Sequence, residues 1–174
     1  GIFFERYVLE LLKQEGAALC RRLCPDPATP QHGSPTLEQW TFPIKSMEVF
    51  PFKSIDSVQR GLDALWIPES TEFPFVDAIV KIGGKVTLIQ CTVQLSHPPT
   101  KSSVEQILKS LDSKELKPES LVWVVDSRSR LSSWQPLHEN VAYPAYDSIP
   151  QYVCRVDEFM CWVAPKTATD PEKS

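Results

Sequence analysis

FPFVDAIVKIGGKVTLIQCTVQLSHP, residues 73–98, consists of two apolar runs on either side of Gly83-Gly84. Glycine tolerates the positive φ angles that tight hairpin turns need, so the diglycine predicts a two-residue turn between two β-strands. A turn of this length also fixes the register of the two strands. We therefore expect Asp77 to lie directly opposite Gln90.

The alternation of side chains along these strands separates polar from apolar positions. Thr92 falls on the same face as Asp77 and Gln90. The opposite face is expected to be nearly all apolar and to consist of Val76, Ala78, Val80, Ile82, Ile89, Cys91 and Val93. A carboxylate near the centre of a sheet is costly to desolvate unless it is hydrogen-bonded, bound to an ion or open to a cleft.

Two interpretations of this polar cluster remain open. In the first, Asp77 accepts hydrogen bonds from Gln90, Thr92 or a nearby backbone N–H, and the cluster is purely structural. In the second, the Asp77 carboxylate, the Gln90 amide oxygen and the backbone carbonyl of Cys91 bind Mg²⁺ or Mn²⁺ together with a substrate phosphate. The register places the Cys91 thiol on the apolar face, as core filling.

Two helices are predicted outside the hairpin. Apolar residues at helical spacing predict a helix over 2–23, interrupted near Gly16. Ser102 and Glu105 have the spacing of a capping box and are followed by an apolar stripe, which predicts that a second helix begins there.

Further short strands are expected in four segments: 39–53, 61–68, 120–126 and 151–163, the last as a strand and turn or as a short helix. The resulting order predicts an α/β sandwich with a mixed central sheet, the hairpin at its centre and helices on its faces.

Length and charge restrict the classes of function. The 174 residues suit one domain, expected over 1–163 and followed by a frayed tail over 164–174. The formal net charge of -4 argues against a broad cationic surface for duplex DNA, so any nucleic-acid contact requires a local patch. No stretch approaches the ~20 apolar residues that span a bilayer, and no membrane contact is expected. Because Gly1 opens directly into a helical pattern, we expect a fragment of a longer polypeptide.

Several of these segments together resemble a known family. A helix containing FFE is followed by LWIPESTEFPFVDAIV, by IQCTVQLSHP, by an amphipathic helix and by an apolar strand. This order resembles the C-terminal effector domains of the Crinkler and retrotransposon-hot-spot type, which look like divergent PD-(D/E)XK nucleases. The resemblance covers Gly1 to Asp126 and implies a restriction-endonuclease-like α/β sandwich.

The resemblance also implies a set of site residues. The first-helix acid of the family falls on Glu5, its motif aspartate on Asp77, its second acidic position on Gln90 and its lysine position on Thr92. The last two depart from the nuclease pattern, because an amide carries no charge and a threonine supplies no cation. His97 follows the second strand closely and could supply a displaced cation, or could bond locally before a proline.

The function implied by the resemblance is that of a virulence effector, secreted into a host cell and acting in the host nucleus. Such a domain would bind or cleave DNA with Mg²⁺ or Mn²⁺, and Asp77 would be the principal metal ligand. The alternative is a catalytically inactive pseudo-nuclease that serves as a protein-interaction or dimerisation module, with a host nuclear protein or a second copy as its partner.

Overall fold

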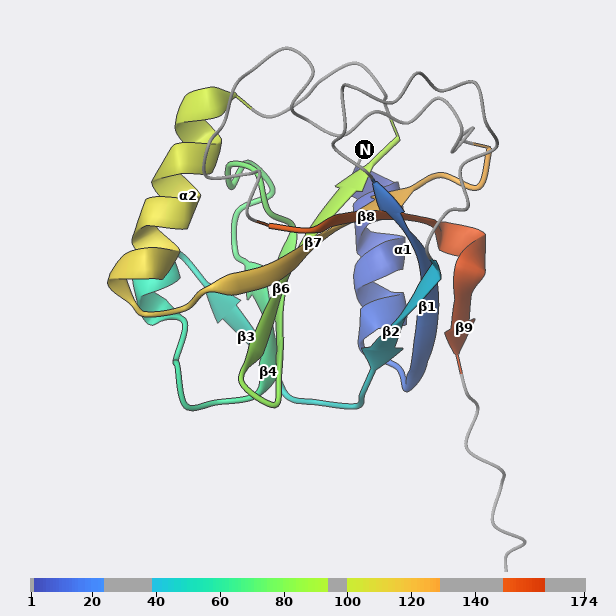
Figure 1. Ribbon diagram of the computed structural model, residues 1–174, viewed down its shortest axis with the longest axis horizontal. Helices are drawn as coiled ribbons and strands as arrows, with labels where there is room; N and C mark the ends of the chain where they lie inside the picture. Colours follow the sequence, from blue (N-terminus) through green and yellow to red (C-terminus); the bar gives the residue numbers. More distant parts are fainter. Residues whose placement is uncertain (1, 24–38, 94–99, 129–148, 162–174) are drawn as a thin grey trace, which may run out of the picture.

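The computed structural model describes residues 2–23, 39–93, 100–128 and 149–161, which form an α/β fold with a mixed sheet. The sheet is strongly curled into a half-barrel (Figure 1). Along the chain the elements are α1 (Ile2–Leu12), β1 (Gly16–Leu23), β2 (Gln39–Ile44), β3 (Val49–Phe52), the 3₁₀ turn η1 (Ile55–Ser57), β4 (Ala64–Pro68), β5 (Ala78–Ile82), β6 (Lys85–Thr92), α2 (Lys101–Ser113), β7 (Pro118–Val125), β8 (Gln151–Arg155), the 3₁₀ turn η4 (Val156–Glu158) and β9 (Phe159–Cys161).

The sheet runs in the order β2-β1-β8-β7-β6-β5-β4-β3, and β9 pairs with β1 beside this path. Strands β6 and β8 run parallel to β7, and β3 runs parallel to β4. The remaining pairs are antiparallel. The predicted mixed sheet is therefore confirmed. The β5–β6 hairpin lies in its interior, as expected from the sequence.

The register of this hairpin follows from its turn. Ile82 pairs with Lys85 and Ile79 with Leu88, as the two-residue loop predicts. Gly83 and Gly84 have φ angles of 58° and 78°. These left-handed values are the ones that make glycine the preferred residue at both positions.

The chain entering β5 departs from the predicted alternation. Phe75 has a φ of 76°, and the N–H of Val76 donates to the carbonyl of Pro74 at 3.0 Å, which closes a γ-turn. Val76 therefore packs on the α2 side of the sheet, whereas Ala78 packs on the α1 side. The assignment of Val76 to the same face as Ala78 was wrong, because Val76 closes the γ-turn and lies before the regular strand, which begins at Ala78.

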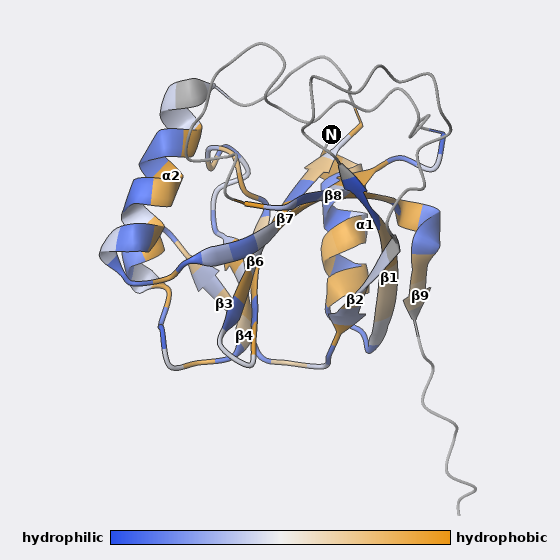
Figure 2. Cartoon of the chain, viewed as in Figure 1, coloured by the Kyte–Doolittle hydropathy of each residue, from blue (hydrophilic) through white to orange (hydrophobic). Residues whose placement is uncertain are grey.

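Each face of the sheet is covered by one helix. Val8, Leu9 and Leu12 of α1 pack in the curve of the sheet against buried side chains that include Ala78, Val80, Ile89, Val122 and Val124. Val104, Ile107 and Leu111 of α2 pack on the other face with Ile79, Leu88, Leu121 and Trp123. Figure 2 shows the apolar stripe of α2 turned toward the sheet. Both faces of the central strands are therefore buried.

Two helix boundaries differ from the sequence expectation. Residues 16–23 were expected to be helical but form β1, because this segment pairs with β2, β8 and β9. The second helix starts at Lys101, with Thr100 as its N-cap: the Thr100 hydroxyl accepts from the Ser103 N–H at 3.3 Å. The cap was expected two residues later, at Ser102. The predicted tail over 164–174 lies outside the described residues.

Candidate functional site

The candidate site lies where the chain enters β5, beside the end of β6. Regular pairing of the two strands ends at Ala78 and Ile89, and the N–H of Asp77 also donates to the carbonyl of Ile89, at 2.9 Å. Two residues thus oppose one, which is the arrangement of a β-bulge. Bulges redirect side chains, and here the bulge follows directly on the γ-turn at Phe75.

Asp77 and Gln90 meet through the backbone of Cys91 instead of pairing directly. The Cys91 N–H donates to Oδ2 of Asp77 at 2.6 Å. Nε2 of Gln90 donates to the carbonyl of Cys91 at 3.3 Å. The carboxylate and the amide expected to face each other are therefore both hydrogen-bonded to the backbone of Cys91, one at its N–H and the other at its carbonyl. The Cys91 carbonyl, expected as a metal ligand, accepts from Gln90 in this arrangement.

Glu5 is brought to this site from the first turn of α1. Its side chain is half-buried, and burial raises the pKa of its carboxyl group. The charge of Glu5 also raises the pKa of Asp77 and of the Cys91 thiol. Two acidic side chains that are 72 positions apart in the sequence are thus electrostatic neighbours in the fold.

Asp77 is the most perturbed carboxyl group of the site. Burial raises its pKa to about 7, and the negative charge of Glu5 adds to the rise, whereas the hydrogen bond from the Cys91 N–H opposes it. The site therefore disfavours a negative charge on Asp77. A cation close to this carboxylate would reverse that preference.

The amide oxygen of Gln90 is the second unusual feature. Oε1 of Gln90 is buried and has no hydrogen-bond partner among the residues that the structure describes. Leaving a buried acceptor unsatisfied costs about 1–3 kcal/mol. Polar atoms of this kind are uncommon in folded proteins and often mark a bound ion or a functional role.

The remaining residues predicted for the site are Thr92, His97 and Cys91. Thr92 is half-buried at the last position of β6, where it pairs with Val125. His97 lies outside the described residues. The Cys91 side chain packs on the α1 side of the sheet, as predicted, and burial raises its thiol pKa well above the ordinary value. This thiol is therefore held in the protonated form.

The structure adds one element of the site that the sequence did not indicate. The γ-turn at Phe75 and the bulge at Asp77 set the direction of the carboxylate. A left-handed φ at a buried phenylalanine has no local sequence signal, since this conformation is rare for residues with a bulky side chain. Pro74, which lacks an N–H, is the only nearby residue that disfavours continued strand pairing.

Comparison with protein-family models, with curated proteins and with solved structures finds no match to this chain. Within the described ranges, no set of three or more His, Cys, Asp or Glu side chains is placed to hold a metal ion. None of the helices in these ranges is long and apolar enough to cross a membrane. The function must therefore be argued from Glu5, Asp77 and Gln90 themselves.

Proposed function

We propose that this chain is an effector domain with a divergent PD-(D/E)XK nuclease-like site, which binds a divalent cation and binds or cleaves DNA. The observation that carries the proposal is the buried amide oxygen of Gln90, which has no hydrogen-bond partner among the described residues, on a side chain that shares the Cys91 backbone with the Asp77 carboxylate. Mg²⁺ and Mn²⁺ prefer oxygen ligands, commonly one or two carboxylates together with waters and substrate phosphates. Glu5, Asp77 and Gln90 supply that set.

A divalent cation would compensate for the two unfavourable features of the site. It would offset the repulsion between the carboxylates of Glu5 and Asp77, and it would lower the pKa of Asp77 toward its ordinary range. It would also give Oε1 of Gln90 a partner. A purely structural network would be expected to satisfy this atom internally.

The order of elements around Asp77 also supports the proposal. The β5–β6 hairpin carries the aspartate, α2 follows it, and β7 returns parallel to β6. Together with α1, which carries Glu5, this is the order that the resemblance to PD-(D/E)XK nucleases implies. We extend the proposal to a restriction-endonuclease-like ancestry for this half-barrel.

In the proposed chemistry the cation would polarise the scissile phosphate and activate a water molecule. Asp77 and Glu5 would hold the cation, and Gln90 would complete its ligands through a neutral oxygen. By the resemblance, Thr92 occupies the position of the usual lysine, so the positive charge that stabilises the pentavalent phosphate would come from the metal or from another residue such as His97. By resemblance, the site of action is the nucleus of a host cell into which the protein is secreted.

A plasmid-nicking assay tests the proposal. The unmodified chain should convert supercoiled DNA to the nicked form with Mg²⁺ or Mn²⁺ and not with EDTA. Asp77→Asn should remove this activity, whereas Asp112→Asn, at an exposed aspartate of α2, should leave it unchanged. A thermal-shift titration with the same ions measures metal binding separately, since a bound ligand stabilises the folded state. Absence of both nicking and a metal-induced shift would refute the proposal.

The second candidate is a pseudo-nuclease that retains the fold as a protein-interaction or dimerisation module. The threonine at the lysine position favours it, and so does the net charge of -4. An absence of both nicking and DNA binding would favour this second candidate. Analytical ultracentrifugation with and without Mg²⁺ would then measure whether two copies associate.

A further inference from the structure

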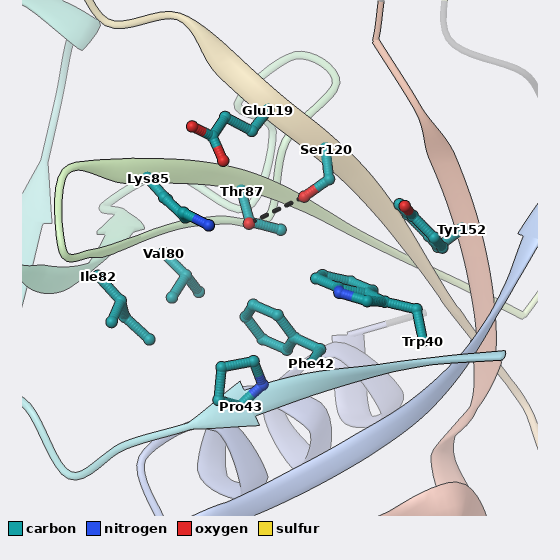
Figure 3. A pocket seen from close by; sticks show the side chains of 10 residues that line it. All are labelled: Trp40, Phe42, Pro43, Val80, Ile82, Lys85, Thr87, Glu119, Ser120 and Tyr152. Atoms are coloured by element: carbon teal, nitrogen blue, oxygen red, sulfur yellow. Dashed lines mark hydrogen bonds between the residues drawn. The ribbon is translucent and has the colours of Figure 1, made fainter.

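A cavity of about 220 Å³ opens in the curve of the sheet, at the end of β5 far from Asp77 (Figure 3). Edge strand β2 forms one wall, and side chains from β5, β6, β7 and β8 form the other. Val80, the lining residue of β5 closest in sequence to Asp77, is three positions from it, or ~10 Å along a strand. The cavity is therefore separate from the candidate metal site.

Aromatic side chains from β2 and β8 lie together along one part of the cavity. The rings of Trp40 and Tyr152 have centroids 4.5 Å apart with an interplanar angle of 32°, and those of Trp40 and Phe42 are 5.5 Å apart at 44°. Figure 3 shows Trp40 and Phe42 extending from β2 toward the opposite strands. Surfaces of this kind favour a flat ring, because every aromatic ligand can present a π-face to them.

Polar groups lie on the opposite wall. The hydroxyls of Thr87 and Ser120 are 3.0 Å apart, and the two residues are only 6% and 5% exposed. Two hydroxyls carry two hydrogens and use one in their mutual bond, so the pair can still donate one hydrogen and accept others. An all-hydrocarbon ligand would cover these groups without compensation, which is costly.

Lys85 and Glu119 add opposite charges beside the hydroxyl pair (Figure 3). Both side chains are exposed. An ammonium group donates to a carbonyl, and a carboxylate accepts from an amine. The carboxylate would also repel a free phosphate. This pairing suits a neutral ring that carries both a carbonyl and an amino group.

The volume limits the size of the ligand. Pockets for drug-sized molecules usually hold about 300–1,000 Å³. A cavity of about 220 Å³ is smaller than that range and suits a single small ring system. A nucleobase combines this size with a flat π-face and with hydrogen-bonding edges.

We propose that this cavity binds one nucleobase that carries both a carbonyl and an amine, as guanine and cytosine do, stacked on Trp40 and hydrogen-bonded at Thr87 and Ser120. The inference does not depend on the proposed metal site. A base in this cavity could come from a free nucleoside or from a single-stranded nucleic acid.

Calorimetric titration with guanosine, cytidine, adenosine and uridine, in EDTA, tests the proposal on the full chain. Guanosine or cytidine should bind with a Kd below about 1 mM. Thr87→Val should weaken this binding about tenfold, because it removes one hydrogen-bonding group. Thr41→Val is the matched control, since Thr41 is exposed on β2 between the inward-facing Trp40 and Phe42, and it should bind as the unmodified chain does.

A second readout separates loss of binding from loss of folding. Amide shifts in ¹⁵N spectra should change on β2 and β6 when the nucleoside is added, and Trp40→Leu should abolish them while the rest of the spectrum is retained. Tighter binding of a single-stranded tetranucleotide than of the nucleoside would identify single-stranded nucleic acid as the source of the base. The proposal is overturned if no nucleoside binds, if all four bind alike, or if Thr87→Val and Thr41→Val have equal effects.

Discussion

The two ends of the β5–β6 hairpin each hold a carboxylate, in opposite electrostatic settings. At the turn, Asp63 accepts from the N–H groups of Gly83 at 2.6 Å and Gly84 at 3.5 Å, and from Nζ of Lys81 at 3.2 Å. These bonds, that of Gly83 first, lower the pKa of Asp63. At the other end, burial and Glu5 raise the pKa of Asp77.

The difference separates a structural network from a candidate site. The Asp63–Lys81 pair combines opposite charges and satisfies the backbone of the turn, so it needs nothing further from outside. The like charge of Glu5 acts on Asp77, and the buried Oε1 of Gln90 has no hydrogen-bond partner among the described residues, so a bound cation could stabilise the carboxylate and give Oε1 a partner. The comparison indicates which of the two acids to test for function.

The backbone shows the same contrast. Left-handed φ angles occur at both ends, at Gly83 and Gly84 in the turn and at Phe75 before Asp77. Glycine adopts this conformation without steric cost, whereas a residue with a side chain in this conformation destabilises the folded state by about 1–3 kcal/mol. A strained backbone persists only where surrounding packing holds the residue in place. Such residues are found preferentially at functional sites.

The largest effect on function is expected for Asp77→Asn. We expect metal-dependent nicking to fall by at least ~100-fold, as for removal of a main charge-stabilising group. The same variant should lose the thermal shift caused by Mn²⁺. Supercoiled plasmid, with Asp112→Asn as the control, provides the measurement. Full activity in Asp77→Asn would place the site elsewhere.

The pH dependence of stability follows from the raised pKa of Asp77. Since the folded state holds the proton up to a pH of about 7 and the unfolded state only to about 3.8, this group's contribution to stability is fully present below pH 3.8 and is lost as the pH rises through 7. We expect the free energy of unfolding to fall by a few kcal/mol, in order of magnitude, between pH 5 and pH 8.

Urea denaturation at pH 5, 6, 7 and 8 measures this effect. Asp77→Asn should flatten the curve and exceed the unmodified chain in stability at pH 8. Adding Mg²⁺ at pH 8 should recover part of the loss in the unmodified chain alone. Parallel curves for the two proteins would show that Asp77 does not titrate in this range.

At the other end of the hairpin, Asp63→Asn should act on stability alone. The Lys81 side chain is only 5% exposed, so the substitution leaves a buried ammonium group without its carboxylate partner. We expect a fall in Tm of several degrees and unchanged nicking per folded molecule. If Asp63→Asn abolished nicking at full stability, the division of the hairpin into a structural and a functional end would fail.

The smallest expected effect is that of Gly84→Ala in the turn. A Cβ at this position would meet no atom within 4 Å, so only the φ of 78° opposes the change. We expect a loss of about 1 kcal/mol, or ~2–4 °C in Tm. Gly61→Ala is the matched control, because that position also has open space and no left-handed φ. Equal Tm values for the two variants would contradict the turn assignment.

Some of the candidate site could be read from the sequence, and some could not. The diglycine identified the hairpin and its register from Ala78 to Ile89, whereas the direct pairing expected between Asp77 and Gln90 is replaced by contacts through Cys91. The resemblance to PD-(D/E)XK nucleases pointed to Glu5. The bulge at Asp77 could not be predicted, because it depends on a γ-turn that only surrounding packing imposes. The Asp63–Lys81 pair was also missed, since Asp63 is a loop residue 18 positions away from its partner.

The local pattern of this chain determined the hairpin, the apolar face that packs against α1 and the existence of two helices, because turn conformation and side-chain period depend mainly on neighbouring residues. Tertiary structure decided that residues 16–23 form β1 and that Glu5 lies close to Asp77. Both outcomes depend on segments distant in the sequence: strand partners supply the hydrogen bonds of β1, and the packing of α1 against β6 determines how strongly a buried carboxylate is desolvated.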